Sequence, residues 1–407
     1  MRSIMHVAHP ISRLHLLLPF ALPTAASAQP ALQGLDKPAL DKLLERATLV
    51  ERVIGDDFQR TLPHERWVAR CFGVGHAAAP AALRQQADDA ASNGRADPSA
   101  TAAAAAAAAA NDDAPLAPYM LLADGGEPRD AVWACVEPVH VQVAHDHLVL
   151  IDPETLQLST DDAAALLAVA RPLIEELGVE LAAPTPLRWY LSSEQLGALA
   201  SAAPLRAAGR NIEIWLPHEA HTGHRPRTWM KLQNEVQMAW FEHPVNQARE
   251  ARGLPAANSI WLHAQGRMMP VSRPFERVLS QAAATRGLAL ASGAAWEMPP
   301  ATFDMLRQHT GDQAAARAAG RGTASVTLVE LDQLSAPFVQ QDWPRFRAAF
   351  AVLERDWFAP ALAALERREL AELALTLCGD TGTTTLVVRP IDIKKFWRRR
   401  PFASLLP

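Results

Sequence analysis

The sequence predicts an α/β fold with a mainly parallel sheet covered by helices. Short apolar segments alternate with long amphipathic ones along much of the chain, and strands joined by helical crossovers pair in parallel. Apolar residues make up 49% of the 407 residues and charged residues 20%. That composition supports a large core and excludes a wholly disordered chain. No apolar stretch reaches the roughly 18 residues that a membrane-spanning helix needs.

The first buried strand is predicted at residues 14–18, an apolar run that ends at Pro19. The same region has the features of an export signal, because arginines precede the apolar run and Ala26-Ser27-Ala28 forms a small-residue cleavage site. Two alternatives follow from the residues alone. The segment is either a strand of a cytoplasmic protein, or Leu14–Ala28 belongs to the signal peptide of an exported one.

The next elements up to residue 210 follow from local patterns. An amphipathic helix is expected at Pro38–Arg46 and another helix from about Pro63. Residues 77–117 contain nine consecutive alanines and predict a low-complexity surface insertion. A compact ββαβ region then follows, with strands near 132–136, 139–143, 148–151 and 187–191 and a helix that Ser159 caps.

A second α/β region is predicted at residues 211–395. Its expected elements are strands at 212–216, 259–263, 326–331 and 373–377 and long helices at 229–252 and 345–368. A basic tail that contains Phe396 and Trp397 closes the chain, and we favour a solvated or docking role for it.

Charge and cysteine content exclude several functional classes. The net charge of −5 and the pI near 6.3 do not fit a generic nucleic-acid binder. Cys71, Cys135 and Cys378 lie far apart without a CxxC pair, which argues against a disulfide framework and a zinc site built of cysteines.

The run from Glu242 to Arg267 carries the most specific motif. It reads EHPVN at 242–246, then Arg249, PAANSIWL at 255–262 and QGR at 265–267. This run resembles a segment of archaeal-type cofactor-independent phosphoglycerate mutases of the alkaline phosphatase superfamily. His263-Ala264 stand where those mutases usually have an aromatic residue and Gly.

The chain is still more similar to a bacterial family labelled RpfE-type regulatory proteins. Members of that family begin near a strand like residues 15–21, without a leader, so the resemblance favours the cytoplasmic alternative. The resemblance implies an alkaline phosphatase-like three-layer α/β/α sandwich with an inserted ββαβ domain. The implied divisions are a first core part at 13–76, the Ala-rich insertion at 77–117, the inserted domain at 118–210, a second core part at 211–395 and the tail at 396–407.

The resemblance also identifies the positions of a catalytic site. Mutases of this class use two divalent metals and a nucleophilic Ser. Here Glu65 stands at the Ser position, while Asp332 and Asp380 keep two of the expected carboxylates without the histidines that normally follow. We therefore expect a catalytically degenerate protein with no metal ligands and no cofactor. The alternative is an active, divergent mutase or phosphohydrolase that uses these three carboxylates with Mn or Zn.

Candidate binding residues follow from the same motifs. They are His64, His243, Asn246, Arg249 and Arg267. For His243 and Asn246 we favour a role in stabilising the helix end. The expected partner is a small phosphorylated ligand or another protein, and neither a nucleic acid nor a membrane.

Two groups of histidines have spacings that permit metal binding. We favour a solvent-exposed strand surface for the first group and a loop for the second. The groups are His140, His145 and His147, and then His218, His221 and His224.

Overall fold

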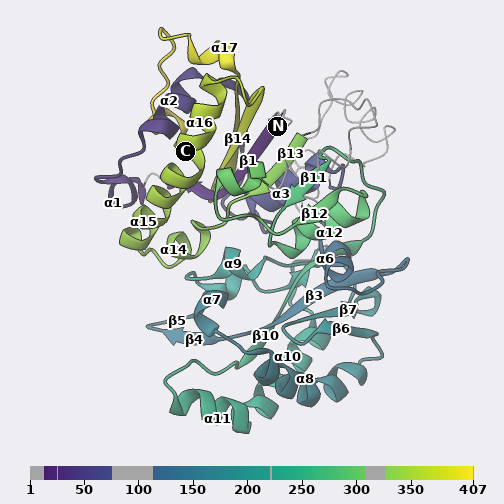
Figure 1. Cartoon of the computed structure of the whole chain (residues 1–407). Coiled ribbons are helices and arrows are strands. Elements are labelled where there is room, and N and C mark those ends of the chain that lie inside the picture. The colour runs from purple at the N-terminus through teal and green to yellow at the C-terminus, as the bar shows by residue number, and fades with distance from the viewer. Residues whose placement is uncertain (1–12, 25, 76–112, 221, 309–325, 407) are drawn as a thin grey trace, which may run out of the picture. The chain divides into compact units, whose positions relative to one another are not determined.

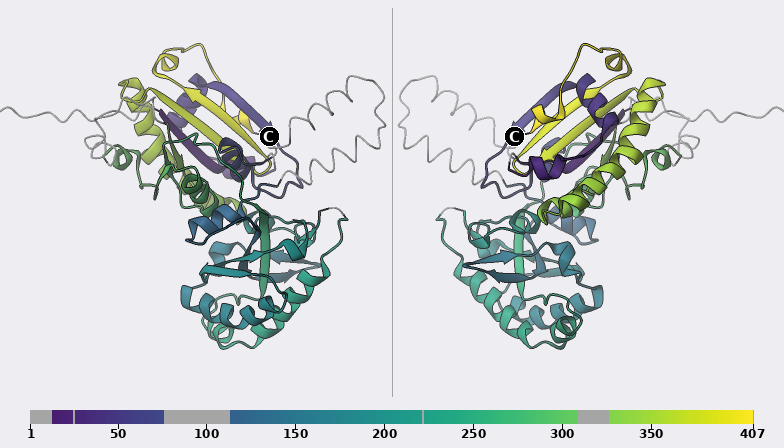
Figure 2. Two further views of the ribbon diagram at one scale, coloured as in Figure 1. Left: turned by 90° about the vertical axis from the view of Figure 1, so that its right-hand side faces the viewer. Right: turned by 90° about the vertical axis from the view of Figure 1, so that its left-hand side faces the viewer.

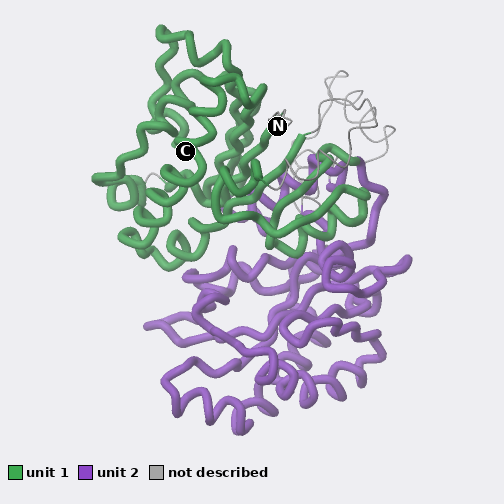
Figure 3. The backbone as a smooth tube through the Cα atoms, viewed as in Figure 1, with its two compact units in different colours: residues 1–56, 273–407 green, residues 57–272 purple. Residues whose placement is uncertain are grey.

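The computed structural model describes residues 13–24, 26–75, 113–220, 222–308 and 326–406 (Figure 1). The chain divides into two compact units (Figure 3). Unit 1 comprises residues 1–56 and 273–407, and unit 2 comprises residues 57–272. Residues 57–76 and 211–272, which were predicted as parts of the core, belong in this division to unit 2. Unit 2 also contains the predicted inserted domain at 118–210. The predicted domain boundaries remain a prediction, and most of the Ala-rich insertion lies outside the described residues.

Unit 1 is built on a seven-stranded sheet with the order β12-β11-β13-β1-β14-β15-β2. The strands from β12 to β14 are parallel, and β15 and β2 run antiparallel at one edge. This confirms the predicted α/β class. The strands are β1 (Arg13–Leu22), β2 (Thr48–Ile54), β11 (Arg277–Leu279), β12 (Ala295–Glu297), β13 (Val326–Glu330), β14 (Glu372–Gly379) and β15 (Gly382–Val388).

The central strand β1 extends beyond its predicted end at Pro19. Its pairing with β14 shifts register between Leu18 and Leu22, and Phe20 within that interval has a positive φ of 53°. A proline lacks a backbone N–H, and a bulge is a place where a strand tolerates that loss. The strand therefore continues past Pro19 and stays buried to Leu22.

The helices of unit 1 include the predicted Pro38–Arg46 helix, which is confirmed as α2. The helix predicted at 345–368 lies along the sheet (Figure 2) but contains a π-helical turn, η4, just before Pro360. Pro360 cannot donate the hydrogen bond that a regular helix would need there. The helices are α1 (Ala28–Leu32), α2, α12 (Ala283–Ala291), α14 (Ser335–Val339), α15 (Trp343–Leu353), η4 (Glu354–Phe358), α16 (Ala359–Glu366), α17 (Pro390–Ile393) and η5 (Phe402–Leu405).

The basic tail docks on unit 1. Arg52 of β2 donates a hydrogen bond to the carbonyl of Leu406 at 3.0 Å, and Arg398 donates to Thr48 Oγ1 at 3.1 Å. Phe402 is buried, whereas Phe396 and Trp397 are exposed. The tail is thus a docked segment with two solvent-facing aromatic rings.

Unit 2 contains a four-stranded antiparallel sheet with the order β10-β3-β7-β6. The strand predicted at 259–263 belongs to this sheet rather than to the parallel one. The strands of unit 2 are β3 (Val132–Val139), β4 (Val141–Ala144), β5 (His147–Leu150), β6 (Leu181–Thr185), β7 (Arg188–Ser192), β8 (Leu199–Ala200), β9 (His218–Glu219) and β10 (Ser259–Arg267).

Two predicted elements of unit 2 are wrong. The strand predicted at 212–216 is a 3₁₀ turn, η3, because the Asn211 side chain accepts a hydrogen bond from the Glu213 amide and so favours a turn. The helix predicted at 229–252 is two helices, since Pro244 breaks it and forces His243 out of the helical region.

Two other helices agree with the patterns that predicted them, namely the helix from Pro63 and the helix capped by Ser159. The helices of unit 2 are α3 (Pro63–Cys71), α6 (Ala117–Ala123), α7 (Pro153–Leu156), α8 (Thr160–Glu175), η2 (Glu194–Leu196), α9 (Pro204–Ala207), η3 (Ile212–Ile214), α10 (Arg227–Phe241) and α11 (Pro244–Ala251). No helix of the described residues is long and apolar enough to cross a bilayer.

The two faces of the four-stranded sheet differ in character. Helices α8 and α10 cover one face (Figure 2), where Val136, Trp189 and Leu262 join one apolar core. Side chains alternate between faces along a strand. The neighbouring positions, among them Cys135 and His263, therefore lie on the opposite face, which carries polar groups.

Candidate functional site

Two of the three carboxylates predicted as catalytic remnants lie at one edge of the unit 1 sheet. Asp332 follows β13 and Asp380 follows β14, and both strands pair in parallel with β1. This carboxyl edge is where ligands usually bind in such sheets. Here Asp332 accepts a hydrogen bond from Ser335. At the end of β1 the edge is apolar, because the buried rings of Phe20 and Phe338 lie 5.0 Å apart.

These residues do not fit a two-metal centre. Such a centre needs several carboxylate and imidazole ligands around each ion. Among the described residues only one group brings three potential donor atoms within 4.8 Å of one another, and it contains neither Asp332 nor Asp380. We derive no metal-dependent step from them.

Glu65 and His64 lie at the start of α3 in unit 2. The Glu65 carboxylate accepts a hydrogen bond from the Leu62 amide at 3.0 Å, as a residue in the first turn of a helix can. His64 is buried, and burial lowers the pKa of its imidazole to about 3. His64 is therefore neutral near pH 7 and offers no positive charge to an anionic ligand.

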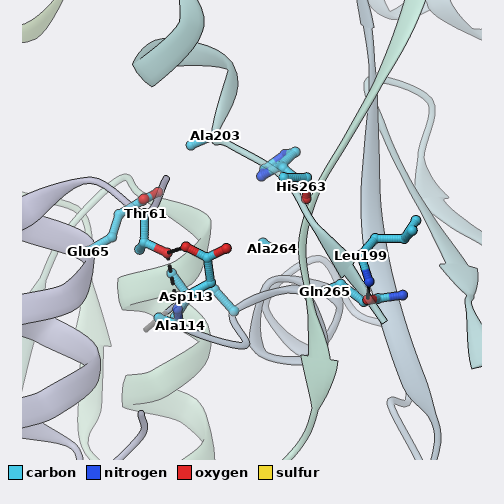
Figure 4. A pocket seen from close by; sticks show the side chains of 11 residues that line it. Thr61, Glu65, Asp113, Ala114, Leu199, Ala203, His263, Ala264 and Gln265 are labelled. Carbon is cyan, nitrogen blue, oxygen red and sulfur yellow. Dashed lines mark hydrogen bonds between the residues drawn. The ribbon is translucent and has the colours of Figure 1, made fainter. Parts of the chain in front are cut away.

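Glu65 also lines a small cavity inside unit 2 (Figure 4). Its volume, measured as space open to the centre of a water molecule, is about 20 Å³, which is enough for a water molecule. On one side Thr61 donates to Asp113 at 3.3 Å and accepts from the Ala114 amide at 3.0 Å. Figure 4 shows His263 and Gln265 of β10 on the other side.

The cavity wall contains a buried polar atom without a partner. Ser201 lines the cavity and is 6% exposed, and within the described part of the chain its hydroxyl makes no hydrogen bond. A buried hydroxyl that loses its partner costs about 1–3 kcal/mol. A guest that can hydrogen-bond to Ser201 would remove that cost.

Backbone strain is located at the same wall. Ala264 has a φ of 59°, and the pairing of β10 with β3 shifts register between His263 and Gly266. A non-glycine residue in this conformation costs on the order of 1–3 kcal/mol, and such strain often marks functional positions. The bulge re-aims the β10 side chains next to the cavity.

Behind the cavity, three side chains with metal-binding chemistry meet on the polar face of the sheet. Cys135 and Glu137 are two residues apart on β3, and the register places His263 of β10 opposite Cys135. The Cys135 thiol donates to Glu137 Oε1 at 3.9 Å, and His263 Nε2 lies 3.4 Å from the same oxygen. Burial and the Glu137 charge raise the pKa of the Cys135 thiol. Burial opposes the charge on Glu137, but the hydrogen bond and the electrostatic attraction of His263, together with the Arg188 charge, outweigh it and lower the pKa of that carboxyl.

A second set of polar groups lies beside these three. Arg188 of β7 donates two hydrogen bonds of 2.9 Å to the two carboxylate oxygens of Asp124. The Tyr190 hydroxyl donates to Asp124 at 2.6 Å. Asp124 is almost completely buried, so its charge requires these partners. The Arg188 charge also acts on Glu137 and Cys135.

The candidate binding residues of the 242–267 run make contacts within unit 2. The Asn246 amide donates to the carbonyls of Trp240 and Ala257 and accepts from the Ala257 amide, at 2.8–3.0 Å. Arg249 is fully buried and donates to Asp162 at 3.2 Å and to the Pro255 carbonyl at 3.1 Å. Asn246 thereby joins the end of α10 to the turn before β10, and Arg249 joins that turn to the start of α8.

His243 and Arg267 have similar local partners. The His243 side chain accepts a hydrogen bond from the Val245 amide at 3.3 Å and so caps α11. Arg267 is half-exposed and pairs with Asp130 at 3.0 Å and with Glu194. A ligand role for the four residues stays a proposal.

The histidine groups do not form metal sites in the described residues. His140 bonds to the Ala256 carbonyl at 2.6 Å and His147 to Asp146 at 2.7 Å. His218 bonds to Arg60 at 2.9 Å, while His221 lies outside the described residues. None of the described histidines of these groups belongs to the set of three donors.

A larger hollow of about 810 Å³, by the same measure, lies elsewhere in unit 2. Its volume is in the range of small-molecule sites. The lining comes from the chain around η2 and from the segment that leads into α10. The polar side chains of the wall include Gln195, Glu219, His224, Arg225 and Arg227. Two arginines and a histidine make this wall suitable for an anion.

The sequence motifs did not identify the polar face or the two hollows. The only available signal was the Cys-x-Glu spacing at 135–137 within a predicted strand, which places both side chains on one face. The contribution of His263 depends on which strand pairs with β3, and Ser201 carries no motif.

Comparisons with known proteins give similarities to solved structures only. No protein-family model matches the sequence, and no curated protein matches it. The PH0037 protein from Pyrococcus horikoshii is 13% identical with a TM-score of 0.45, over 97% of this chain and 92% of that one. A cofactor-independent phosphoglycerate mutase from Thermoplasma acidophilum is 11% identical with a TM-score of 0.37, over 97% of this chain and 94% of that one. Similarity at this level assigns no role to any residue.

Proposed function

We propose that this chain is a phosphoglycerate mutase-like protein of the RpfE type that has lost two-metal catalysis and acts by binding, in a regulatory role in the cytoplasm. The observation that carries the proposal is the apolar carboxyl edge at the end of β1. Pro19-Phe20-Ala21 occupy the place where the resemblance expects a metal-binding carboxylate, and Phe20 packs against Phe338. An apolar edge of this kind does not hold divalent cations.

The position of β1 supports the cytoplasmic assignment. This strand lies between β13 and β14 in the middle of the unit 1 sheet. A mature chain that began after Ala28 would lack it, and the parallel pairs on both sides would be lost. The place of residues 14–22 in this sheet therefore supports their use as a structural strand rather than as part of a signal peptide.

A small phosphorylated molecule is the ligand class that we propose. The 810 Å³ hollow has the size for it, and Arg225 and Arg227 supply the positive charge that a phosphate attracts. Arg225 is only 4.0 Å from Glu213, at the limit of an ion pair, and about half-exposed, so it is available to a ligand. The 20 Å³ cavity is too small for such a molecule.

The test is a coupled assay that measures conversion of 3-phosphoglycerate to 2-phosphoglycerate with Mn²⁺ or Zn²⁺ present. We expect the full chain to show no turnover above that of its Asp332→Asn, Asp380→Asn double variant. Turnover that the double variant abolishes would refute the loss of catalysis and favour the active-enzyme alternative.

Binding is measured separately by calorimetry with 3-phosphoglycerate and with inorganic phosphate. Arg225→Gln combined with Arg227→Gln should weaken binding at least about tenfold, because each charge-assisted hydrogen bond contributes about 1.5–3 kcal/mol. Arg171→Gln, on the exposed surface of α8, is the matched control and should leave the affinity unchanged. Equal binding by the arginine double variant would exclude this hollow as the phosphate site.

A further inference from the structure

The strongest unassigned chemistry in the described residues is the group on the polar face of the unit 2 sheet. It consists of Cys135, Glu137 and His263, whose donor atoms all lie within 4.8 Å of one another. All three belong to the neighbouring, hydrogen-bonded strands β3 and β10 of one sheet, so the backbone holds them in place. We propose that this group binds a zinc ion.

The distances support a tetrahedral site. Zinc binds His nitrogen and carboxylate oxygen at about 2.0–2.2 Å and Cys sulfur at about 2.3 Å, which places tetrahedral ligands about 3.3–3.6 Å apart. His263 Nε2 and Glu137 Oε1 are 3.4 Å apart, and Cys135 Sγ and the same oxygen are 3.9 Å apart. The donor atoms of Cys135 and His263 lie within 4.8 Å of each other, so the thiol completes the geometry by moving closer to both partners.

The ligand types select the metal. A thiolate with an imidazole and a carboxylate suits zinc, whereas Mg²⁺ and Mn²⁺ favour sites built of oxygen ligands. Zinc requires the thiolate, so binding transfers the Cys135 proton to solvent as the sulfur–metal bond forms. No oxidant or reductant takes part in this step.

Charge balance also favours a divalent ion. With the thiolate formed, its sulfur and the carboxylates of Asp124 and Glu137 carry three negative charges, and Arg188 carries one positive charge. The net charge of these four groups is then −2, which the charge of +2 on a zinc ion neutralises. A buried set of charges is costly unless it is compensated in this way.

The cavity supplies the remaining coordination position. His263 belongs to the group and also lines the 20 Å³ cavity, which is large enough for a water molecule. Three protein ligands with one water is the arrangement of open zinc sites. The buried Ser201 hydroxyl lines the same cavity, and within the described residues it makes no hydrogen bond, so it can bond to that water.

The experiment uses the full chain without a His-rich tag, stripped with a chelator and titrated with zinc against a chromophoric competitor. We expect one tightly bound zinc ion per chain. Cys135→Ser and Glu137→Gln should each weaken binding by more than the 10–100-fold that the loss of an outer-sphere partner costs. Cys378→Ser is the matched control, because Cys378 is equally buried but lies in unit 1 and outside the group.

A spectroscopic measurement on the unaltered chain keeps the test independent of whether the variants fold. Cobalt bound in place of zinc should give a thiolate-to-metal charge-transfer band and the visible spectrum of a tetrahedral ion. Absence of both the zinc stoichiometry and this band would overturn the proposal. Two ions that persist in Cys135→Ser but disappear in Asp332→Asn would instead refute the proposed loss of the two-metal site, so the two failures are distinguishable.

Discussion

Lowering the pH should destabilise the unit 1 sheet through a single buried histidine. His15 lies on the central strand β1 and is 9% exposed. Its Nε2 bonds to Thr376 Oγ1 at 2.8 Å, and Thr376 bonds to Thr385 at 2.8 Å, which connects three adjacent strands. Burial lowers the pKa of His15 from its ordinary value of 6.5 to about 3.

The sign and the size of the effect follow from proton linkage. Because the folded-state pKa of His15 is depressed, the unfolded chain binds more protons at any pH between about 3 and 6.5. The stability contributed by a neutral His15 is therefore present above pH 6.5 and declines as the pH falls. At about pH 5, protonation of His15 stabilises the unfolded chain by about 2 kcal/mol, whereas His15 of the folded chain stays neutral. The free energy of unfolding falls by that amount.

The assay is urea unfolding followed by circular dichroism at about pH 7.5 and about pH 5. A His15→Gln variant removes the titrating group and keeps a side chain that can bond to Thr376. From about pH 7.5 to about pH 5, the free energy of unfolding of the variant should fall by about 2 kcal/mol less than that of the unaltered chain. His64 contributes its own loss equally to both proteins, so the difference isolates His15. Equal pH sensitivity in the two proteins would refute a neutral, buried His15.

Two further predictions concern unit 2, and each is measured by thermal unfolding. Gly266→Ala should destabilise the chain by about 1–3 kcal/mol, because an added Cβ would lie 2.0 Å from the Pro115 Cβ; an unchanged midpoint would contradict this packing. Asn246→Ala should cost about 2–4 kcal/mol, since it leaves the buried Ala257 amide without its hydrogen bond, whereas the exposed control Gln247→Ala should change the stability by less than about 0.5 kcal/mol.

Local patterns predicted the elements whose stability depends on nearby residues. The apolar spacing at Pro38–Arg46 gave α2 with its bounds, and the Ser159 hydroxyl caps α8 as its position in the sequence indicates. The break at Pro244 was also a local signal, because the residue before a proline avoids the helical region. The periodic apolar pattern on both sides of Pro244 led to the prediction of one helix.

Strand membership could not be predicted in the same way. The segment at 259–263 has the short apolar run of a strand, but nothing in that run specifies whether it pairs with β3 or joins the parallel sheet. Partner choice depends on residues far away in the chain, such as Val139 opposite Ser259. For the same reason, the strand was wrongly predicted to end at Pro19. The bulge that accommodates this proline lies in the pairing of β1 with β14, which the local sequence does not specify.

The candidate metal group shows how this limit affects function. Cys135 and His263 are 128 positions apart in the sequence, and only the register of β3 with β10 brings them together. Sequence motifs identified the positions at the unit 1 edge, where the resemblance expects metal chemistry and the rings of Phe20 and Phe338 lie at the end of β1. The donors with metal-binding geometry lie instead in unit 2, where sulfur is available and selects zinc over manganese. The identity of the bound metal therefore reports which unit binds it: zinc retention that depends on Cys135 assigns it to unit 2, and manganese retention that depends on Asp332 and Asp380 assigns it to unit 1.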